Sequence, residues 1–100
     1  MVENIRIINL DEFDIEEKQI FDRLTEEYGT KFERILEKGL IILHPKKYDK
    51  DGKRARYCIN LRTDIPDLIF SAEAEEWDLA KALHKVFIKL ENEVKKRLKL

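Results

Sequence analysis

Hydrophobic residues recur along the first third of the chain at two different spacings. Residues 4–10 (NIRIINL) are rich in isoleucine and alternate imperfectly, which predicts a short strand. Asp14 can then cap a helix, with Glu17 completing a capping-box pattern. Large apolar residues follow every three or four positions, at Phe21, Leu24, Tyr28, Phe32 and Ile35. This spacing predicts a helix with one buried side, ending near Gly39, where a left-handed C-cap is expected.

The middle of the chain has the shorter period of β-strands. Residues 40–44 (LIILH) predict a second strand, and Pro45 weakens it beyond that point, which favours an edge or a bulge there. A DKDG turn at residues 49–52 leads into a third strand, residues 54–62, in which apolar residues alternate strictly with mostly basic ones. After a DIPD turn, the alternation of residues 68–72 predicts a fourth strand.

A second helix is predicted from a start between Glu75 and Asp78 to the C-terminus. Its apolar positions share one side at about 100° per residue; they are Leu79, Leu83, Val86, Phe87, Leu90, Val94 and Leu98. The order β-α-β-β-β-α predicts an α+β two-layer sandwich, with a four-stranded, mostly antiparallel sheet and two helices on one face. The length of 100 residues predicts a single domain, residues 1–100.

Charge is separated along the chain, although the formal net charge is only −1. Residues 1–40 hold six basic and eleven acidic side chains, and residues 41–70 hold seven and four. Residues 71–84 hold one and four, and residues 85–100 hold six and two. Such segregation suggests a partner of one sign on one surface. With 41% charged residues, no apolar run is long enough for a membrane span, and a lone Cys58 fits a cytoplasmic protein.

The basic residues of the final helix form a candidate binding surface. Six lysines fall within an arc of about 120° opposite the apolar side; they are Lys81, Lys85, Lys89, Lys95, Lys96 and Lys99. A plain solvated face is the alternative, because lysine favours helices and cations suit a helix C-terminus. Against that alternative, no glutamate lies within the arc, although acids outnumber bases in the chain.

A second basic group lies around the predicted hairpin. Its members are Lys46, Lys47, Lys50, Lys53, Arg54 and Arg56, with Tyr48 among them. Lysines on edge strands also prevent strands of different molecules from pairing, which is the alternative interpretation of this group. Together the two groups resemble a footprint for nucleic-acid phosphates, which position a protein without reading sequence.

Catalytic patterns were sought and none is predicted. His44 and His84 lie far apart and outside metal-ligand spacing, and Cys58 has no base beside it in sequence. The three glycines are isolated, so a phosphate-binding loop is not expected. Trp77 is interpreted as a lid over the edge of the core, with a base-stacking platform as the alternative. We therefore expect no enzyme, no cofactor, no metal and no small-molecule substrate.

The stretch FSAEAEEWDLAKALHKVFIKLENEVKK, residues 70–96, resembles the ribosome hibernation-promoting factor and ribosome-associated inhibitor A family. The shared features are Ser71-Ala72-Glu73, Asp78-Leu79, Ala80, Ala82, Val86-Phe87, Lys89-Leu90 and the basic tail from Lys95 to Arg97, with Lys31-Phe32-Glu33 in the first helix. The resemblance implies binding to the small ribosomal subunit in the decoding channel, where messenger and transfer RNA would be blocked. It also implies basic contacts at Lys31, Lys89 and Lys96.

Three features depart from the family pattern. About two residues are inserted between Glu73 and Asp78, the first helix is acidic, and the chain ends at Leu100, as expected for a short, single-domain form that is monomeric when free. Two other functions stay open. One is a protein–protein module that uses the acidic first helix, and the other is a general binder of double-stranded RNA.

Overall fold

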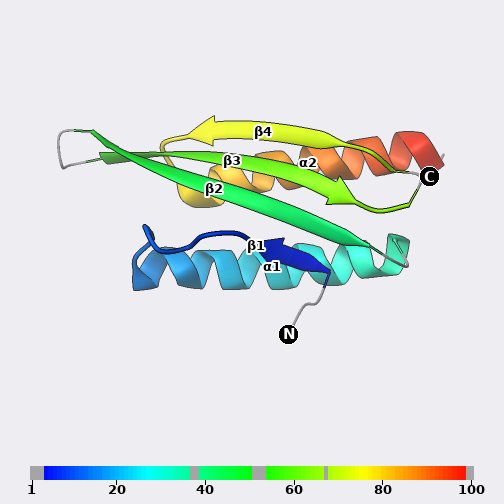
Figure 1. The fold of residues 1–100 in the computed structure, drawn as a ribbon, viewed down its shortest axis with the longest axis horizontal. Coiled ribbons are helices and arrows are strands. Elements are labelled where there is room, and N and C mark those ends of the chain that lie inside the picture. Colours follow the sequence, from blue (N-terminus) through cyan, green and yellow to red (C-terminus); the bar gives the residue numbers. More distant parts are fainter. Residues whose placement is uncertain (1–3, 37–38, 51–53, 67, 99–100) are drawn as a thin grey trace.

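One mixed sheet and two helices make up the protein. The computed structural model describes the backbone of residues 4–36, 39–50, 54–66 and 68–98, and the side chains of all of these except 49, 50, 54 and 98. The elements are β1 (Ile5–Ile7), α1 (Ile15–Ile35), β2 (Leu40–Lys50), β3 (Arg54–Asp64), β4 (Ser71–Glu76) and α2 (Leu79–Leu98). Their order along the chain is the predicted β-α-β-β-β-α (Figure 1).

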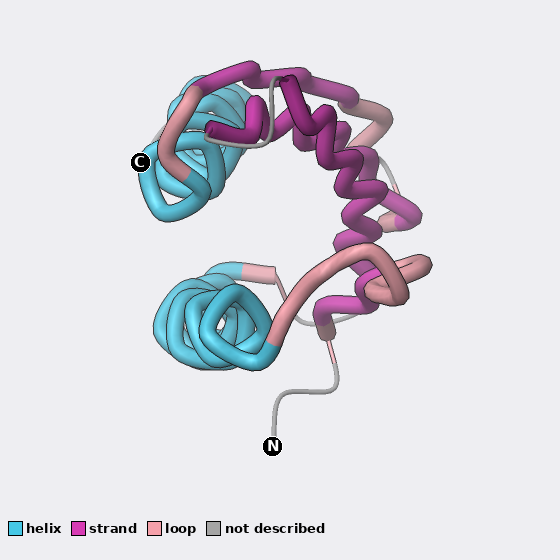
Figure 2. Tube along the Cα trace, turned by 90° about the vertical axis from the view of Figure 1, so that its left-hand side faces the viewer, coloured by secondary structure: helices cyan, strands magenta, loops and turns pink. Residues whose placement is uncertain are grey.

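The strands lie side by side in the order β1-β2-β3-β4. β1 pairs with β2 in parallel, and the other two pairs are antiparallel. Figure 2 shows both helices on one side of a strongly curved sheet. The predicted α+β sandwich is therefore confirmed, and the one parallel pair arises because α1 carries the chain back to the start of the sheet.

The core fills the space between the sheet and the helices. Its largest fully buried side chains come from α1, α2 and the two central strands; they are Phe21, Phe32, Phe87, Leu24, Ile41, Leu43, Ile59, Leu61, Leu83, Leu90, Val86 and Val94. Side chains of a strand alternate between its two faces. The residues that alternate with these along each strand therefore point away from the helices. We call that side of the sheet the outer face.

Helix α1 begins as predicted and ends earlier. The backbone N–H of Glu17 donates to the Asp14 carboxylate at 2.8 Å, and the N–H of Asp14 donates to the Glu17 carboxylate at 2.9 Å, so the capping box is present. The helix ends at Ile35 with Leu36 as its C-cap, so the prediction that Gly39 caps it was wrong. Gly39 instead has a φ of +115°, and a Cβ there would lie 2.5 Å from the Cγ1 of Ile65.

Strand β2 continues through Pro45, where the sequence had suggested that it would weaken. Pro45 is buried and lies opposite Ile59 of β3. Ile41 and Leu43 have the same orientation as Pro45, and their backbone groups form hydrogen bonds on the β1 side. The Ile41 N–H donates to the backbone oxygen of Asn4, and the Leu43 oxygen accepts from the N–H of Ile8. β1 ends at Ile7, so the missing N–H of Pro45 faces an edge that no strand covers, and no ladder hydrogen bond is lost. The predicted edge is thus correct, whereas the predicted end of the strand was wrong.

Four other elements have boundaries that differ from the predicted ones. β3 continues two residues further than predicted, to Asp64. β1 covers only three of the seven predicted residues. β4 begins at Ser71 rather than Leu68 and continues to Glu76, while Leu68 forms an isolated bridge with Ile65. α2 accordingly starts at Leu79, one residue beyond the predicted interval. Asp78 caps it, because its carboxylate accepts from the backbone N–H of Lys81 at 2.9 Å.

Candidate nucleic-acid interface

Four of the predicted lysines of α2 follow the free edge of the sheet. β4 is the last strand of the sheet and α2 runs back along it, so Lys81, Lys85, Lys89 and Lys96 pass beside β4 from its end to its beginning. Lys89 donates to the backbone oxygen of Glu73 at 2.8 Å. Lys96 lines a cavity of about 450 Å³ together with Phe70, Ser71 and Ala72. We call these four lysines the edge row.

One carboxylate of β4, that of Glu76, balances part of the charge of the edge row. The Lys85 ammonium donates to the Glu76 carboxylate, and the Lys81 ammonium lies 3.9 Å from it. The hydrogen bond from Lys85 lowers the pKa of Glu76, so this acid stays ionised at neutral pH. Lys89 has a neutral carbonyl oxygen as its partner, so no carboxylate among the described residues balances its charge. The edge row is thus less basic at Lys81 and Lys85 than the sequence suggested.

Lys31, on α1, is paired with α2. Its ammonium forms an ion pair with Glu91, whose side chain is 13% exposed. Their mutual hydrogen bond raises the pKa of Lys31 and lowers that of Glu91, and Lys95 lowers the pKa of Glu91 further. The pair joins the two helices beside the contact between the rings of Tyr28 and Phe87, so Lys31 adds an ion pair to the packing of the helix layer.

Lys46, Lys95 and Lys96 differ from the paired lysines in being exposed and without a carboxylate partner among the described residues. All three are exposed. Within the ranges that the structure describes, no ion pair or side-chain hydrogen bond involves any of the three ammonium groups. Lys53 and Lys99 lie outside the described residues, as do the side chains of Lys50 and Arg54.

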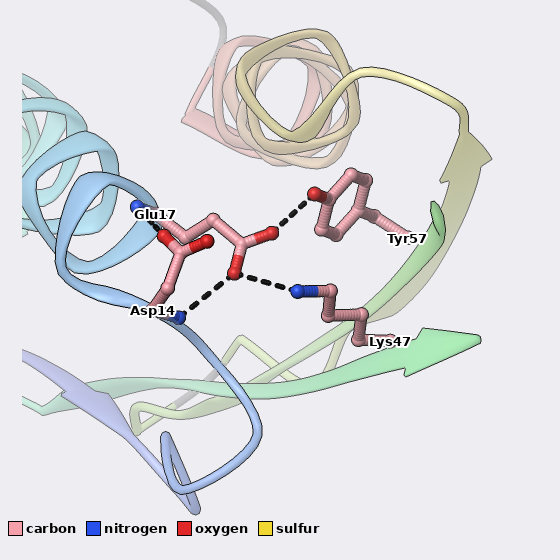
Figure 3. Close-up of polar contacts among 4 residues, drawn as sticks. All are labelled: Asp14, Glu17, Lys47 and Tyr57. Atoms are coloured by element: carbon pink, nitrogen blue, oxygen red, sulfur yellow. Dashed lines mark hydrogen bonds and ion pairs between the residues drawn. The ribbon is translucent and has the colours of Figure 1, made fainter. Parts of the chain in front are cut away.

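Lys47 does not lie on the outer face with its neighbour Lys46. It points towards α1, where its ammonium lies 2.9 Å from the Glu17 carboxylate (Figure 3). The Glu17 carboxylate also accepts from the Tyr57 hydroxyl of β3. Burial raises the pKa of Glu17, but the hydrogen bonds from Tyr57, from the Asp14 backbone and from Lys47 outweigh it, so the pKa is lowered. We therefore interpret Lys47 as part of a structural contact.

Arg56 lies on the outer face, held by two neighbours. Its Nε is 2.5 Å from the Glu75 carboxylate of β4, and its Cζ lies 5.6 Å from the ring centroid of Tyr48 on β2. The register also places Arg6 and Arg62 on either side of Ile42 on this face, and His44 opposite Asn60. The alternating pattern of the third strand predicts that Arg62 and Asn60 lie on its outer face. No local pattern in the sequence predicts that Arg6 lies beside them.

The residues considered for other chemistry have structural partners. His84 Nδ1 is 2.7 Å from the Tyr28 hydroxyl, and Cys58 is buried with its thiol 3.5 Å from the Glu73 carboxylate. Burial and the nearby Glu73 raise the pKa of the Cys58 thiol, which disfavours the reactive thiolate. Trp77 is 45% exposed, so the predicted role of a lid is at most partial. In the described part of the chain, no cluster of His, Cys, Asp and Glu could hold a metal ion, and neither described helix could cross a membrane.

Comparison with known proteins adds a structural match. No protein-family model and no curated protein matches the sequence. Two of the solved structures that match the fold do so over almost the whole of both chains. The N-terminal domain of Protein Y from Thermus thermophilus is 18% identical, with a TM-score of 0.59, over 95% of this chain and 96% of its own. A ribosomal subunit interface protein from Coxiella burnetii is 18% identical, with a TM-score of 0.55, over the full length of both.

This chain has their fold. The fold that the family resemblance implies is therefore confirmed from one end of the domain to the other. At 18% identity the match concerns the arrangement of helices and strands, and the residues of an interface have to be argued from the geometry of this chain.

Proposed function

We propose that this protein is a ribosome-associated translation inhibitor of the hibernation-promoting factor family, which binds the small ribosomal subunit in the decoding channel. The observation that carries the proposal is the shared fold over the whole chain with Protein Y and with a protein described as a ribosomal subunit interface protein. The resemblance of residues 70–96 to the family supports it independently. The protein would act in the cytoplasm by binding alone, without a cofactor.

The mechanism is occlusion. The domain measures 45 × 25 × 17 Å, and an elongated body of this kind can fill a channel along which messenger and transfer RNA must pass. No bond is made or broken in this mechanism. Lysines hold the domain in place by contacting rRNA phosphates, which gives strong and salt-dependent binding without sequence readout.

The lysines differ in what they can contribute. Lys89, Lys95 and Lys96 have no carboxylate hydrogen-bonded to them among the described residues, so their charge is available to phosphates. Lys81 and Lys85 share Glu76, and a phosphate must compete with that carboxylate. Lys31 is paired with Glu91, so a phosphate must compete with that carboxylate as well. We therefore infer that the last turns of α2 contribute more affinity than its first turns.

A pair of charge-neutralising variants tests the interface. Lys89→Gln with Lys96→Gln removes two cations of the edge row, and Lys18→Gln with Arg34→Gln removes two exposed cations of α1 as a matched control. Each lost phosphate contact should reduce the slope of log affinity against log salt by about 0.7–0.9. We expect the edge-row variant to lose affinity for purified small subunits, with a slope lower by about 1.5, and the control to sediment with them like the wild type.

Three outcomes would contradict the proposal. Equal binding by the two variants would remove the edge row from the interface. Binding to naked RNA duplex as tight as to small subunits would favour a general binder of double-stranded RNA. Salt-independent recovery of a protein partner without RNA would favour the protein–protein module. Sucrose-gradient sedimentation at two salt concentrations, with circular dichroism to verify folding, provides the measurement.

A further inference from the structure

The outer face of the sheet carries an exposed aromatic ring that its neighbours hold in place. Tyr48 of β2 is 42% exposed, and the guanidinium of Arg56 lies over its ring at 5.6 Å. Arg56 is in turn anchored by Glu75 at 2.5 Å, so three strands contribute to the arrangement. A cation over one face of an aromatic ring is attractive and limits the motion of the ring. An exposed ring held in this way is a pre-formed stacking surface.

A cavity lies beside this ring. It has a volume of about 400 Å³ and is lined by His44, Lys46 and Tyr48 of β2 and by Ile8, Asn9 and Glu12 of the segment after β1. It exists because β1 stops at Ile7 and leaves the edge of β2 uncovered. The segment that follows, in which Asn9 has a left-handed φ of +68°, forms the other wall. The volume is within the range of ligand-binding cavities, about 300–1,000 Å³.

Cations surround the ring and continue across the same face. Lys46 is two residues from Tyr48 on the same side of β2, and no ion pair with a described residue engages it. Arg6 and Arg62 flank Ile42, six residues from Tyr48 along β2, or about 20 Å at strand spacing. Two described acids lie near the ring: Glu12 lines the cavity, and Glu75 is paired with Arg56. Glu73 on β4 and Asp64 at the end of β3 lie farther along the outer face. The part formed by β1, β2 and the middle of β3 is therefore basic.

We propose that this outer face binds single-stranded nucleic acid, with one base stacked on Tyr48 beside the cavity and with phosphates on Lys46 and on the Arg6–Arg62 pair. An aromatic ring next to cations is the combination with which proteins bind unpaired bases, since a base inside a duplex cannot stack on a side chain. The site goes beyond the proposed function, because it involves none of the lysines of α2 and does not require a ribosome.

Fluorescence anisotropy with a labelled 12-nucleotide RNA of mixed sequence, single-stranded or as a duplex, tests the site. Removing a stacking ring typically costs between about 5-fold and 150-fold in affinity. We expect Tyr48→Ala to weaken single-strand binding about tenfold or more without changing its salt slope, and Tyr48→Phe, which keeps the ring, to bind like the wild type. Lys46→Gln should lower the salt slope by about 0.7, the contribution of one phosphate on a single strand.

The outcomes distinguish this site from the proposed ribosomal interface. Unchanged affinity in Tyr48→Ala, an equal loss in Tyr48→Phe, or duplex binding as tight as single-strand binding would each overturn the inference. The Lys89→Gln, Lys96→Gln variant should keep its affinity for the oligonucleotide, and loss of that affinity would assign the binding to α2 instead. If that variant binds small subunits normally, the proposed interface fails while the inference stands.

Discussion

At the scale of single residues, Glu17 joins three elements through one carboxylate. It is 7% exposed and is the only charged side chain that is buried among the described residues. One oxygen accepts from the Asp14 backbone and from Lys47, and the other accepts from the Tyr57 hydroxyl (Figure 3). A buried charge is tolerated only when it is paired and hydrogen-bonded, and these contacts meet that condition. The start of α1 is thereby fixed to the two longest strands.

We expect Glu17→Gln to lower the free energy of unfolding by about 2–3 kcal/mol, because it removes the negative charge to which the Lys47 ammonium and the Tyr57 hydroxyl donate in a buried position. Urea denaturation provides the measurement, and Glu16→Gln is the control, since Glu16 is exposed in the same turn. The folded-state pKa of Glu17 is below its ordinary value of 4.5. The contribution of the ionised Glu17 carboxylate to the free energy of unfolding is therefore complete above pH 4.5 and is lost as the pH falls through the folded-state pKa. The difference between the wild type and Glu17→Gln should shrink on acidification, and a difference independent of pH would contradict this assignment.

At the scale of elements, the start of α2 depends on a single cap. The Asp78 carboxylate accepts from the Lys81 N–H, and no acid lies in the first helical turn to assist it. Replacing such a cap with alanine costs about 1 kcal/mol. We expect Asp78→Ala to lower stability by that amount in urea denaturation and Asp78→Asn, which keeps the acceptor oxygen, to remain close to the wild type. Equal losses in both variants would mean that the charge, and not the cap, is what matters.

The elements themselves could largely be predicted from local patterns. The apolar spacing of α1 and α2 and the alternation of β3 correctly indicate which side of each element is buried. Two of the errors are at positions where the outcome depends on a neighbouring strand. Pro45 is tolerated inside β2 because β1 is too short to cover that edge, and β4 extends to Glu76 because β3 offers it a partner as far as Tyr57. Neither fact is visible in a window of a few residues.

At the scale of the whole molecule, long-range pairing decides which cations are available to a partner. Lys47 meets Glu17 thirty residues away, and Lys31 meets Glu91 sixty residues away. Both lysines were predicted to bind RNA, and both have a carboxylate partner in the fold, although the Lys31 side chain remains 50% exposed. Spacing along a helix can predict the outward arc of α2, but it cannot show that a carboxylate at the end of β4 accompanies Lys81 and Lys85. The candidate interface was therefore only partly predictable.

The contact between the two helices should be the most sensitive point of the molecule. Phe87 of α2 is fully buried, stacks on Tyr28 with ring centroids 4.5 Å apart, and lies 6.3 Å from the ring of Phe32. Truncating a buried phenylalanine costs about 3–5 kcal/mol, which is a large share of the roughly 5–15 kcal/mol that stabilises a domain of this size. We expect Phe87→Ala to lower the urea midpoint severely or to prevent folding, whereas Ile88→Ala, next to it but 45% exposed, should change stability by less than about 0.5 kcal/mol. Phe87→Leu keeps most of the buried volume and should fall between the two. A Phe87→Ala protein as stable as the Ile88→Ala control would mean that the helices are held to the sheet independently, with little dependence on each other.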